Sequence, residues 1–160
     1  MKKSAGIVLF RIEDKRPEVF LVHPGGPFWA KKDAGSWSIP KGEFGEEENP
    51  QDAARREMEE ETGIKTEGLL IELTPVRQKS GKIIYAWALQ QDADPQSITS
   101  NLFEMEWPPK SGNTQSFPEI DRAAWFELPE AKKMLIPGQV AILDELEGKL
   151  NALFGIKERF

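Results

Sequence analysis

Residues 39–64, IPKGEFGEEENPQDAARREMEEETGI, contain the pattern around which the rest of the chain is organised. Asn49 is a favourable N-cap residue, Pro50 suits the first helical position, and Gly63 suits the position just past a helix C-terminus. These signals predict a helix over residues 51–62, entered from a sharp turn at Gly42. Ala54 and Met58 are both apolar and lie four residues apart, so we expect them to share the face of this helix that packs on the core.

The last turns of this helix carry an unfavourable cluster of carboxylates. Glu57, Glu60 and Glu61 are three or four residues apart and therefore share one face, where each like-charge pair costs about 0.2–0.5 kcal/mol. They also lie at the helix end whose dipole repels anions. A sequence that breaks two local rules at once indicates a functional site, and a divalent cation would reverse both penalties.

The spacing of the whole stretch matches a known motif. Gly42 is followed by five residues, Glu48, seven residues, and then REMEEETGI at positions 56–64. This resembles the box of the Nudix hydrolase family, G-x5-E-x7-R-E-U-x-E-E-x-G-U with U aliphatic, at every defined position, and Met58 serves as the first U. The strict resemblance covers residues 42–64, while strand order and the preceding SIPK extend a looser resemblance over most of the chain.

The resemblance implies metal-assisted hydrolysis of a phosphoanhydride bond. Hard carboxylate oxygens suit Mg²⁺, with Mn²⁺ as the alternative, and such ions are commonly shared with substrate phosphates. Arg56 lies one residue off the acidic face, within reach of Glu59, Glu60 or Asp52, and is expected to hold a glutamate in place. The implied metal ligands are Glu57, Glu60, Glu61 and a backbone carbonyl of Lys41 or Gly42.

The water-activating base is either Glu57 or a glutamate outside the box. Many Nudix enzymes place such a glutamate in a loop before a late strand, and Glu119 matches that position best. Glu104 and Glu106 are rivals. Glu48 matches a motif position that usually supports the structure between loop and helix.

Residues outside the acidic cluster are candidates for substrate contact. Lys41 directly precedes the box, and Lys31 and Lys32 lie in a long loop ahead of it, so all three are candidates for phosphate binding. Trp29 and Trp107 are placed in loops, where an indole ring can stack on a nucleobase.

Two further features have mainly structural interpretations. His23, the single histidine, is interpreted as a packed or loop-capping residue rather than a phosphate ligand or base. Trp37 and Tyr85 are assigned to the core.

The composition restricts the remaining possibilities. A chain of 160 residues predicts one domain over residues 1–160, and a formal net charge of −6 argues against a nucleic-acid partner. The absence of cysteine excludes disulfides and thiolate chemistry. No apolar run is long enough to span a membrane or serve as a signal segment, so we expect no membrane contact and a cytoplasmic location. The oligomeric expectation is a monomer or homodimer.

The remaining elements predict an α/β fold with several strands and about three helices. The resemblance adds the detail of an α/β/α sandwich with a mixed β-sheet. Residues 91–120 contain four prolines and are interpreted as a long loop with at most one short strand. Strands are expected at residues 5–12, 18–23, 37–40, 69–78, 82–90 and 123–128, and helices at residues 129–135 and 138–154.

The substrate is inferred from the sequence that enters the box. Pro40-Lys41-Gly42 resembles the Nudix enzymes that cut dinucleoside polyphosphates and diphosphoinositol polyphosphates. A small nucleotide or diphosphate is therefore expected, with dinucleoside polyphosphates and nucleoside triphosphates first and diphosphoinositol polyphosphates as an alternative. The competing class is a non-catalytic Nudix-fold module that senses a nucleotide or binds a protein, but such modules usually lose box glutamates. Neither a calcium-binding loop nor a phosphate-binding P-loop motif is present.

Overall fold

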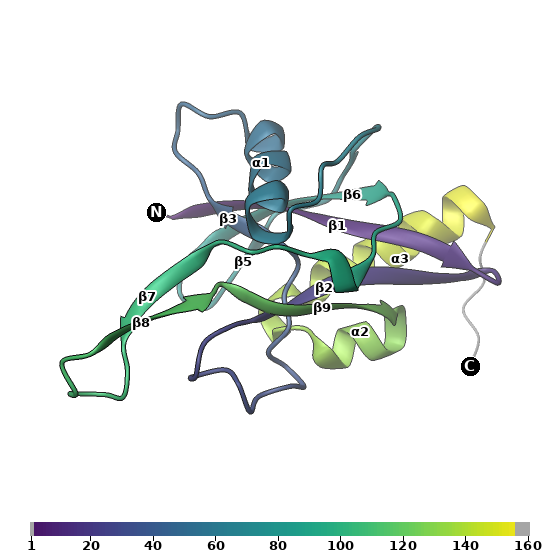
Figure 1. Cartoon of the computed structure of the whole chain (residues 1–160). Helices are drawn as coiled ribbons and strands as arrows, with labels where there is room; N and C mark the ends of the chain where they lie inside the picture. The colour runs from purple at the N-terminus through teal and green to yellow at the C-terminus, as the bar shows by residue number, and fades with distance from the viewer. Residues whose placement is uncertain (1, 156–160) are drawn as a thin grey trace.

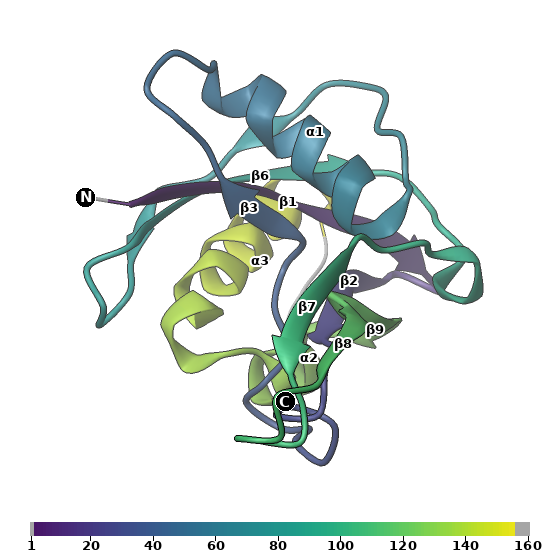
Figure 2. The same cartoon turned by 60° about the vertical axis from the view of Figure 1, so that its left-hand side comes forward.

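A mixed β-sheet lies between helices in the computed structural model, which describes residues 2–155 (Figures 1 and 2). The strands are β1 (Lys3–Glu13), β2 (Arg16–Pro24), β3 (Lys41–Glu43), β4 (Ile71–Glu72), β5 (Val76–Arg77), β6 (Ile83–Gln90), β7 (Leu102–Glu106), β8 (Thr114–Pro118) and β9 (Ile120–Glu127). The α-helices are α1 (Pro50–Thr62), α2 (Leu128–Met134) and α3 (Val140–Phe154), and the short 3-10 turns are η1 (Pro95–Ser97) and η2 (Pro137–Gln139).

Strand β1 is the centre of the sheet. The order is β4-β6-β1-β2-β9, with β1 parallel to β6 and antiparallel to β2. Strand β2 pairs with the end of β1, and on the same edge Ser4–Gly6 near the start of β1 pair with β3. The chain that enters the box is therefore fixed to the central strand. A second sheet contains only β7 and β8, which form a hairpin that projects from the body of the protein in Figure 1.

Each face of the sheet has its own apolar core, which confirms the predicted α/β/α sandwich. Side chains such as Ile7, Leu9 and Phe20 alternate along their strands onto the face that α1 covers, where they meet Met58. On the opposite face, the strands pack against α2 and α3, whose buried side chains include Leu128, Leu143, Leu146 and Leu150. Within residues 2–155, no helix is long and apolar enough to cross a membrane.

Helix α1 begins and ends at the residues that the sequence indicates. The Asn49 side chain accepts hydrogen bonds from the backbone N–H groups of Gln51 and Asp52, and Pro50 occupies the first turn. Gly63 ends the helix in the left-handed conformation, at φ 78°. Ala54 and Met58 are fully buried, so the apolar face lies on the sheet and the acidic face is left toward the box turn.

The prediction of a long loop over residues 91–120 is wrong, because this segment contains both strands of the β7–β8 hairpin. The prolines, which suggested a loop, lie in η1, at the hairpin tip and at the end of β8. The missed signal is the period-two alternation of LFEME at residues 102–106, in which Phe103 and Met105 are partly buried while Glu104 and Glu106 are exposed.

Three other predicted elements require smaller corrections. The strand predicted at residues 69–78 is two short strands, β4 and β5, separated around Pro75, which has no N–H to donate to a ladder. Trp37 and Ser38 form only isolated bridges, and the regular pairing begins at Lys41 in β3. The helix predicted at residues 138–154 begins only at Val140, after η2, and its buried side ends at Leu150, because Leu153 is 62% exposed.

Candidate active site

The acidic face of α1 is held against the turn that precedes it. Gly42 lies so close to Glu57 that a Cβ atom at this position would overlap the Glu57 carboxylate. The backbone N–H of Lys41 donates a 3.0 Å hydrogen bond to Glu61 Oε1. Because Lys41 and Gly42 both pair with β1, the central strand fixes the turn on which the two carboxylates rest.

Arg56 connects three carboxylates in one network. Its Nε and Nη2 donate to the two Glu48 carboxylate oxygens at 2.7 and 2.9 Å, and its Nη1 donates to Glu57 at 2.7 Å and Glu60 at 3.0 Å. The same contacts lower the pKa of the Glu48 carboxyl group. Arg56 therefore holds a glutamate as predicted, but its partners are Glu48 and Glu57 as well as Glu60, rather than Asp52 or Glu59.

Burial makes two carboxylates of this site, those of Glu57 and Glu61, more difficult to ionise. Burial raises the pKa of Glu61 to about 7, and the charges of Glu57 and Glu119 add to this rise against the opposing Lys41 contacts. Burial also raises the pKa of Glu57, although the hydrogen bond from Arg56 opposes the change. The Lys41 ammonium is itself desolvated, which lowers its pKa.

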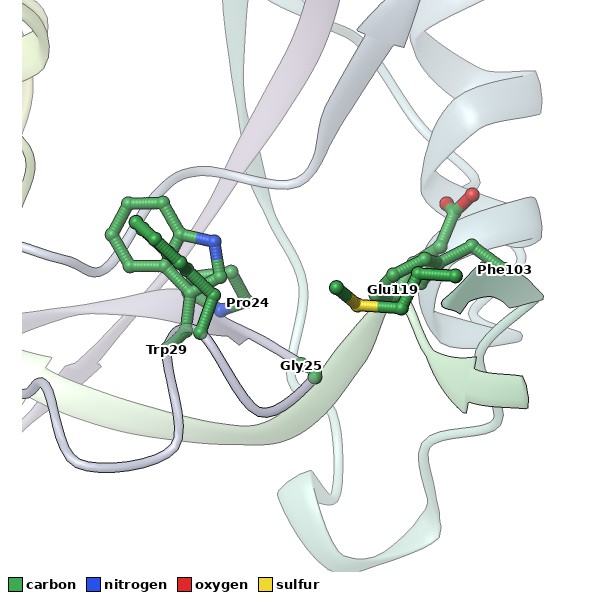
Figure 3. Close-up of a pocket in the computed structure, with 8 residues that line it drawn as sticks. Pro24, Gly25, Trp29, Phe103 and Glu119 are labelled. Carbon is green, nitrogen blue, oxygen red and sulfur yellow. The ribbon is translucent and has the colours of Figure 1, made fainter. Parts of the chain in front are cut away.

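Glu119 is an acidic residue from a different part of the chain, and its carboxylate points toward α1. It lies between β8 and β9, where its N–H donates to the Asn101 carbonyl and its own carbonyl accepts from the Gly25 N–H, both at 2.8 Å. Its charge raises the pKa of both Glu57 and Glu61. In Figure 3 its carboxylate points toward that helix.

An open cleft of about 350 Å³ begins at Glu119 (Figure 3). Trp29 and Phe28 form the wall that belongs to the loop after β2, while Phe103 and Met105 of β7 form the opposite wall. The remaining lining residues are Pro24, Gly25 and Gly26. The cleft therefore combines aromatic walls with a single carboxylate at the end that faces α1.

The predicted substrate-binding residues are distributed unequally around this cleft. Trp29 lines it, and the Lys32 ammonium lies over the rings of Phe28 and Trp29 at 4.4 and 4.9 Å. Lys31 is exposed on the same loop. Trp107 is partly buried at the end of β7 and does not line the cleft, so the structure does not bring it together with Trp29.

The rival glutamates lie on the other side of the hairpin. Glu104 and Glu106 are exposed on β7 and alternate with Phe103 and Met105, which face the cleft. Glu106 also accepts a 2.8 Å hydrogen bond from the Lys110 N–H at the hairpin tip. Glu119 is thus the glutamate outside the box that accompanies the α1 carboxylates.

Sequence reasoning missed the wall of the cleft that the hairpin forms and the glycines that line the cleft. Phe103 and Met105 could have been found from the alternating pattern of β7. Gly25 packs so tightly on the end of β8 that a Cβ atom would overlap the Pro118 carbonyl oxygen, a contact that only the tertiary structure reveals.

The donor chemistry of the site fits a hard divalent cation. Glu57, Glu60 and Glu61 offer carboxylate oxygens, and the glycine at position 42 leaves room for the Glu57 carboxylate beside the backbone. In the part of the chain that the structure describes, no three acidic or histidine side chains are grouped tightly enough to surround an ion. Arg56 and the Lys41 N–H instead supply the partners of these carboxylates.

Among solved structures with the same fold, the names of two mention a nucleotide compound, Ap4A or ADP ribose. The structure of a Caenorhabditis elegans Ap4A hydrolase binary complex matches 96% of this chain and 100% of its own, with a TM-score of 0.67 and 21% identity. The NUDIX domain of Shewanella oneidensis NrtR, crystallised with ADP ribose, matches 92% of this chain and 87% of its own, with a TM-score of 0.64 and 16% identity.

Similar sequences carry the description RNA pyrophosphohydrolase. The protein from Bartonella tribocorum is 27% identical over 95% of this chain and 93% of its own length. The protein from Bartonella henselae is 36% identical, but over only 44% of this chain and 40% of its own length. The family profile described as NUDIX domain matches residues 1–146. With a complete box, the expected sandwich and this match over most of its length, the chain belongs to the Nudix hydrolase family.

Proposed function

We propose that the chain hydrolyses a phosphoanhydride bond in a nucleoside diphosphate linked to another moiety, with dinucleoside polyphosphates and nucleoside triphosphates as the first candidates. One observation carries this proposal: Glu119 lines the end of an aromatic cleft and points its carboxylate toward α1, where its charge raises the pKa of the partly buried Glu57 and Glu61. Acidic groups that burial makes costly to ionise are suited to a bound cation and to proton transfer.

The proposed cation is Mg²⁺, or alternatively Mn²⁺, held by Glu57, Glu60, Glu61 and a backbone carbonyl of Lys41 or Gly42. When bound, such an ion neutralises phosphate charge and acidifies coordinated water. In this proposal Arg56 orients Glu57 and Glu60 through the hydrogen bonds described above.

A general base must accept the proton of the attacking water, and Glu119 is our first candidate, with Glu57 as the alternative. Glu119 has a backbone fixed on both sides and a carboxylate directed toward the acidic helix. Its charge influences both Glu57 and Glu61, so it lies within the same electrostatic environment as the proposed metal ligands.

The cleft supplies a place for a nucleobase. A base between Trp29 and Phe103 would gain about 1–3 kcal/mol by stacking on an aromatic side chain. The phosphates would then extend past Glu119 toward α1, with Lys31, Lys32 and Lys41 as candidate phosphate contacts. Trp107 has no position in this arrangement.

A hydrolysis panel with Mg²⁺ tests the proposal. It should contain nucleoside triphosphates, diadenosine polyphosphates, nucleotide sugars and diphosphoinositol polyphosphates, with phosphate release measured by a coupled phosphatase. Glu57→Gln, Glu60→Gln and Glu119→Gln should each lose most activity while circular dichroism shows folded protein. Glu59→Gln is the matched control, because Glu59 is exposed on the same helix and lies outside the network. Wild-type rates in all three site variants would refute the assignment.

Two alternatives are decided by the same panel. Uniform inactivity would favour a non-catalytic module that senses a nucleotide or binds a protein, and activity confined to diphosphoinositol polyphosphates would favour that substrate class. The relatives described as RNA pyrophosphohydrolase motivate one further substrate, a 5′-triphosphorylated oligonucleotide. We expect little turnover of it, since a formal net charge of −6 argues against a nucleic-acid partner.

The proposal includes a single domain over residues 1–160 that acts in the cytoplasm as a monomer or homodimer, on small molecules rather than on nucleic acid or at a membrane. Light scattering after size-exclusion chromatography tests the oligomeric state. Cell fractionation tests the location.

A further inference from the structure

His23 is a fully buried polar residue that none of the proposed catalytic roles uses. It is the only histidine in the chain and lies near the end of β2. Its ring packs edge-on against Trp37 at a centroid distance of 5.3 Å, on the face of the sheet opposite α1. Both of its nitrogens have protein partners, and those partners belong to segments that border the cleft.

The first partner is produced by an irregularity in strand β9. His23 pairs with Arg122, whereas the next residue, Pro24, pairs with Ile120, so Asp121 is the extra residue of a β-bulge. The Asp121 carboxylate is a hydrogen-bond acceptor that lies 2.9 Å from His23 Nδ1. Bulges redirect side chains, and this one directs Asp121 to His23 only two residues after Glu119.

The second partner lies in the loop that carries one wall of the cleft. His23 Nε2 is 2.6 Å from the carbonyl oxygen of Lys32. The Lys32 N–H in turn donates to the Trp29 carbonyl, and the Trp29 N–H donates to Gly26. Through these bonds, the position of Lys32 determines the position of the Trp29 wall.

Both partners of the ring are hydrogen-bond acceptors. The ring lies between them, with one nitrogen directed at each acceptor, and so connects Asp121 of β9 with Lys32 of the loop. His23 itself does not line the cleft.

We propose that His23 is a positioning residue for substrate: it ties residues 25–33 to strand β9 and thereby fixes the Trp29 wall of the cleft relative to Glu119. The substrate part of this inference rests on the proposed function. The loop has two other ties: the hydrogen bond from the Gly25 N–H to the Glu119 carbonyl at its near end, and the 3.6 Å ion pair between Asp33 and Arg122 of β9 at its far end. His23 is the contact that holds the Lys32 carbonyl between them, so its loss should loosen the Trp29–Lys32 turn and leave Gly25 and Asp33 attached.

Hydrogen exchange tests the tie without requiring any activity. His23→Phe keeps a buried ring and removes both bonds, while Asp121→Ala removes one acceptor from a side chain that is 31% exposed and thus tests the idea even if the first variant does not fold. In both, the amides of Trp29 and Lys32 should exchange about tenfold faster, because their local turns lose an anchor. The amide of Trp107 at the hairpin tip is the internal control and should not change.

A conservative variant separates positioning from general stability. Asp121→Asn keeps an oxygen acceptor for His23 Nδ1 and should restore the wild-type exchange rates. With a substrate from the panel, His23→Phe and Asp121→Ala should raise KM about tenfold and leave kcat within about twofold, since substrate orientation changes while the carboxylates do not. Asp121→Asn should keep the wild-type KM.

Each outcome decides the inference. Unchanged exchange at Trp29 and Lys32, or faster exchange throughout the chain, overturns the positioning role, and so does selective loop release without a change in KM. If no panel substrate is hydrolysed, the affinity for ADP, measured by tryptophan fluorescence, replaces KM. The proposed function then fails on the panel, while the exchange and ADP data still decide whether His23 positions the cleft.

Discussion

Replacing Glu61 with glutamine should stabilise the metal-free protein at neutral and alkaline pH. Burial raises the pKa of this carboxyl group from 4.5 to about 7. Between these values the unfolded chain has released the proton and the folded chain retains it, so the free energy of unfolding falls as the pH rises from about 5 to about 7. At about 1.4 kcal/mol per pH unit, the ionised carboxylate costs the folded state at most about 3.5 kcal/mol above pH 7.

Glutamine removes the charge and keeps the amide oxygen that accepts from the Lys41 N–H. Because the side chain is only partly buried, we expect Glu61→Gln to raise the free energy of unfolding by about 2 kcal/mol at pH 8 in chelator, less than the full cost of the charge. Near pH 5 the folded carboxyl group is protonated, and the difference should be much smaller than at pH 8. Glu59→Gln makes the same charge change at an exposed position of the same helix and should stay within about 0.5 kcal/mol of wild type.

Urea unfolding in chelator, followed by tryptophan fluorescence, measures these free energies at the two pH values. Added Mg²⁺ should then stabilise the wild type at pH 8 more than the Glu61→Gln variant, because the variant lacks one proposed ligand. The reasoning about charge burial is wrong if Glu61→Gln is destabilised at pH 8, or if its advantage is the same at both pH values.

Three other substitutions test separate parts of the site. Gly42→Ala places a methyl group on the Glu57 carboxylate and should lower kcat about 100-fold at a cost of about 1–3 kcal/mol in stability, as measured by steady-state kinetics and urea unfolding; near-normal kcat would contradict the tight contact. Asn49→Ala removes the N-cap of α1 and should lower the free energy of unfolding by about 1 kcal/mol while kcat stays unchanged. Phe103→Ala should raise KM about tenfold, whereas Leu102→Ala, on the exposed side of β7, should leave KM unchanged; equal effects would exclude a stacking role for the cleft wall.

The helix at the centre of the site was predictable because its signals are local. Asn49, Pro50 and Gly63 each act on the backbone within one turn, and the structure uses all three as the sequence indicates. The carboxylate pattern of the box likewise depends only on helical spacing. The layered arrangement followed from the family resemblance and is confirmed by an apolar core on each face of the sheet.

The partners of these residues were less predictable, because they come from distant parts of the chain. Arg56 was expected to bind within one helical turn, yet its shortest bonds include Glu48, which the preceding loop brings back over the helix start. The hairpin was missed because its prolines outweighed the alternation of β7, and Phe103 was missed with it; Trp107, a predicted stacking candidate, does not line this cleft. The bulge at Asp121 leaves no signal in the sequence that we identified.

The independence of the β7–β8 hairpin has a consequence for how this protein can diversify. Its ladder is separate from the main sheet, and residues 102–118 contribute no side chain to either fully buried core. Substitutions there can reshape one wall of the cleft while the acidic helix and its supporting strand remain intact. Recognition and chemistry are thereby encoded in separable stretches of sequence, and an exchange of the hairpin alone is a rational route to altered substrate preference.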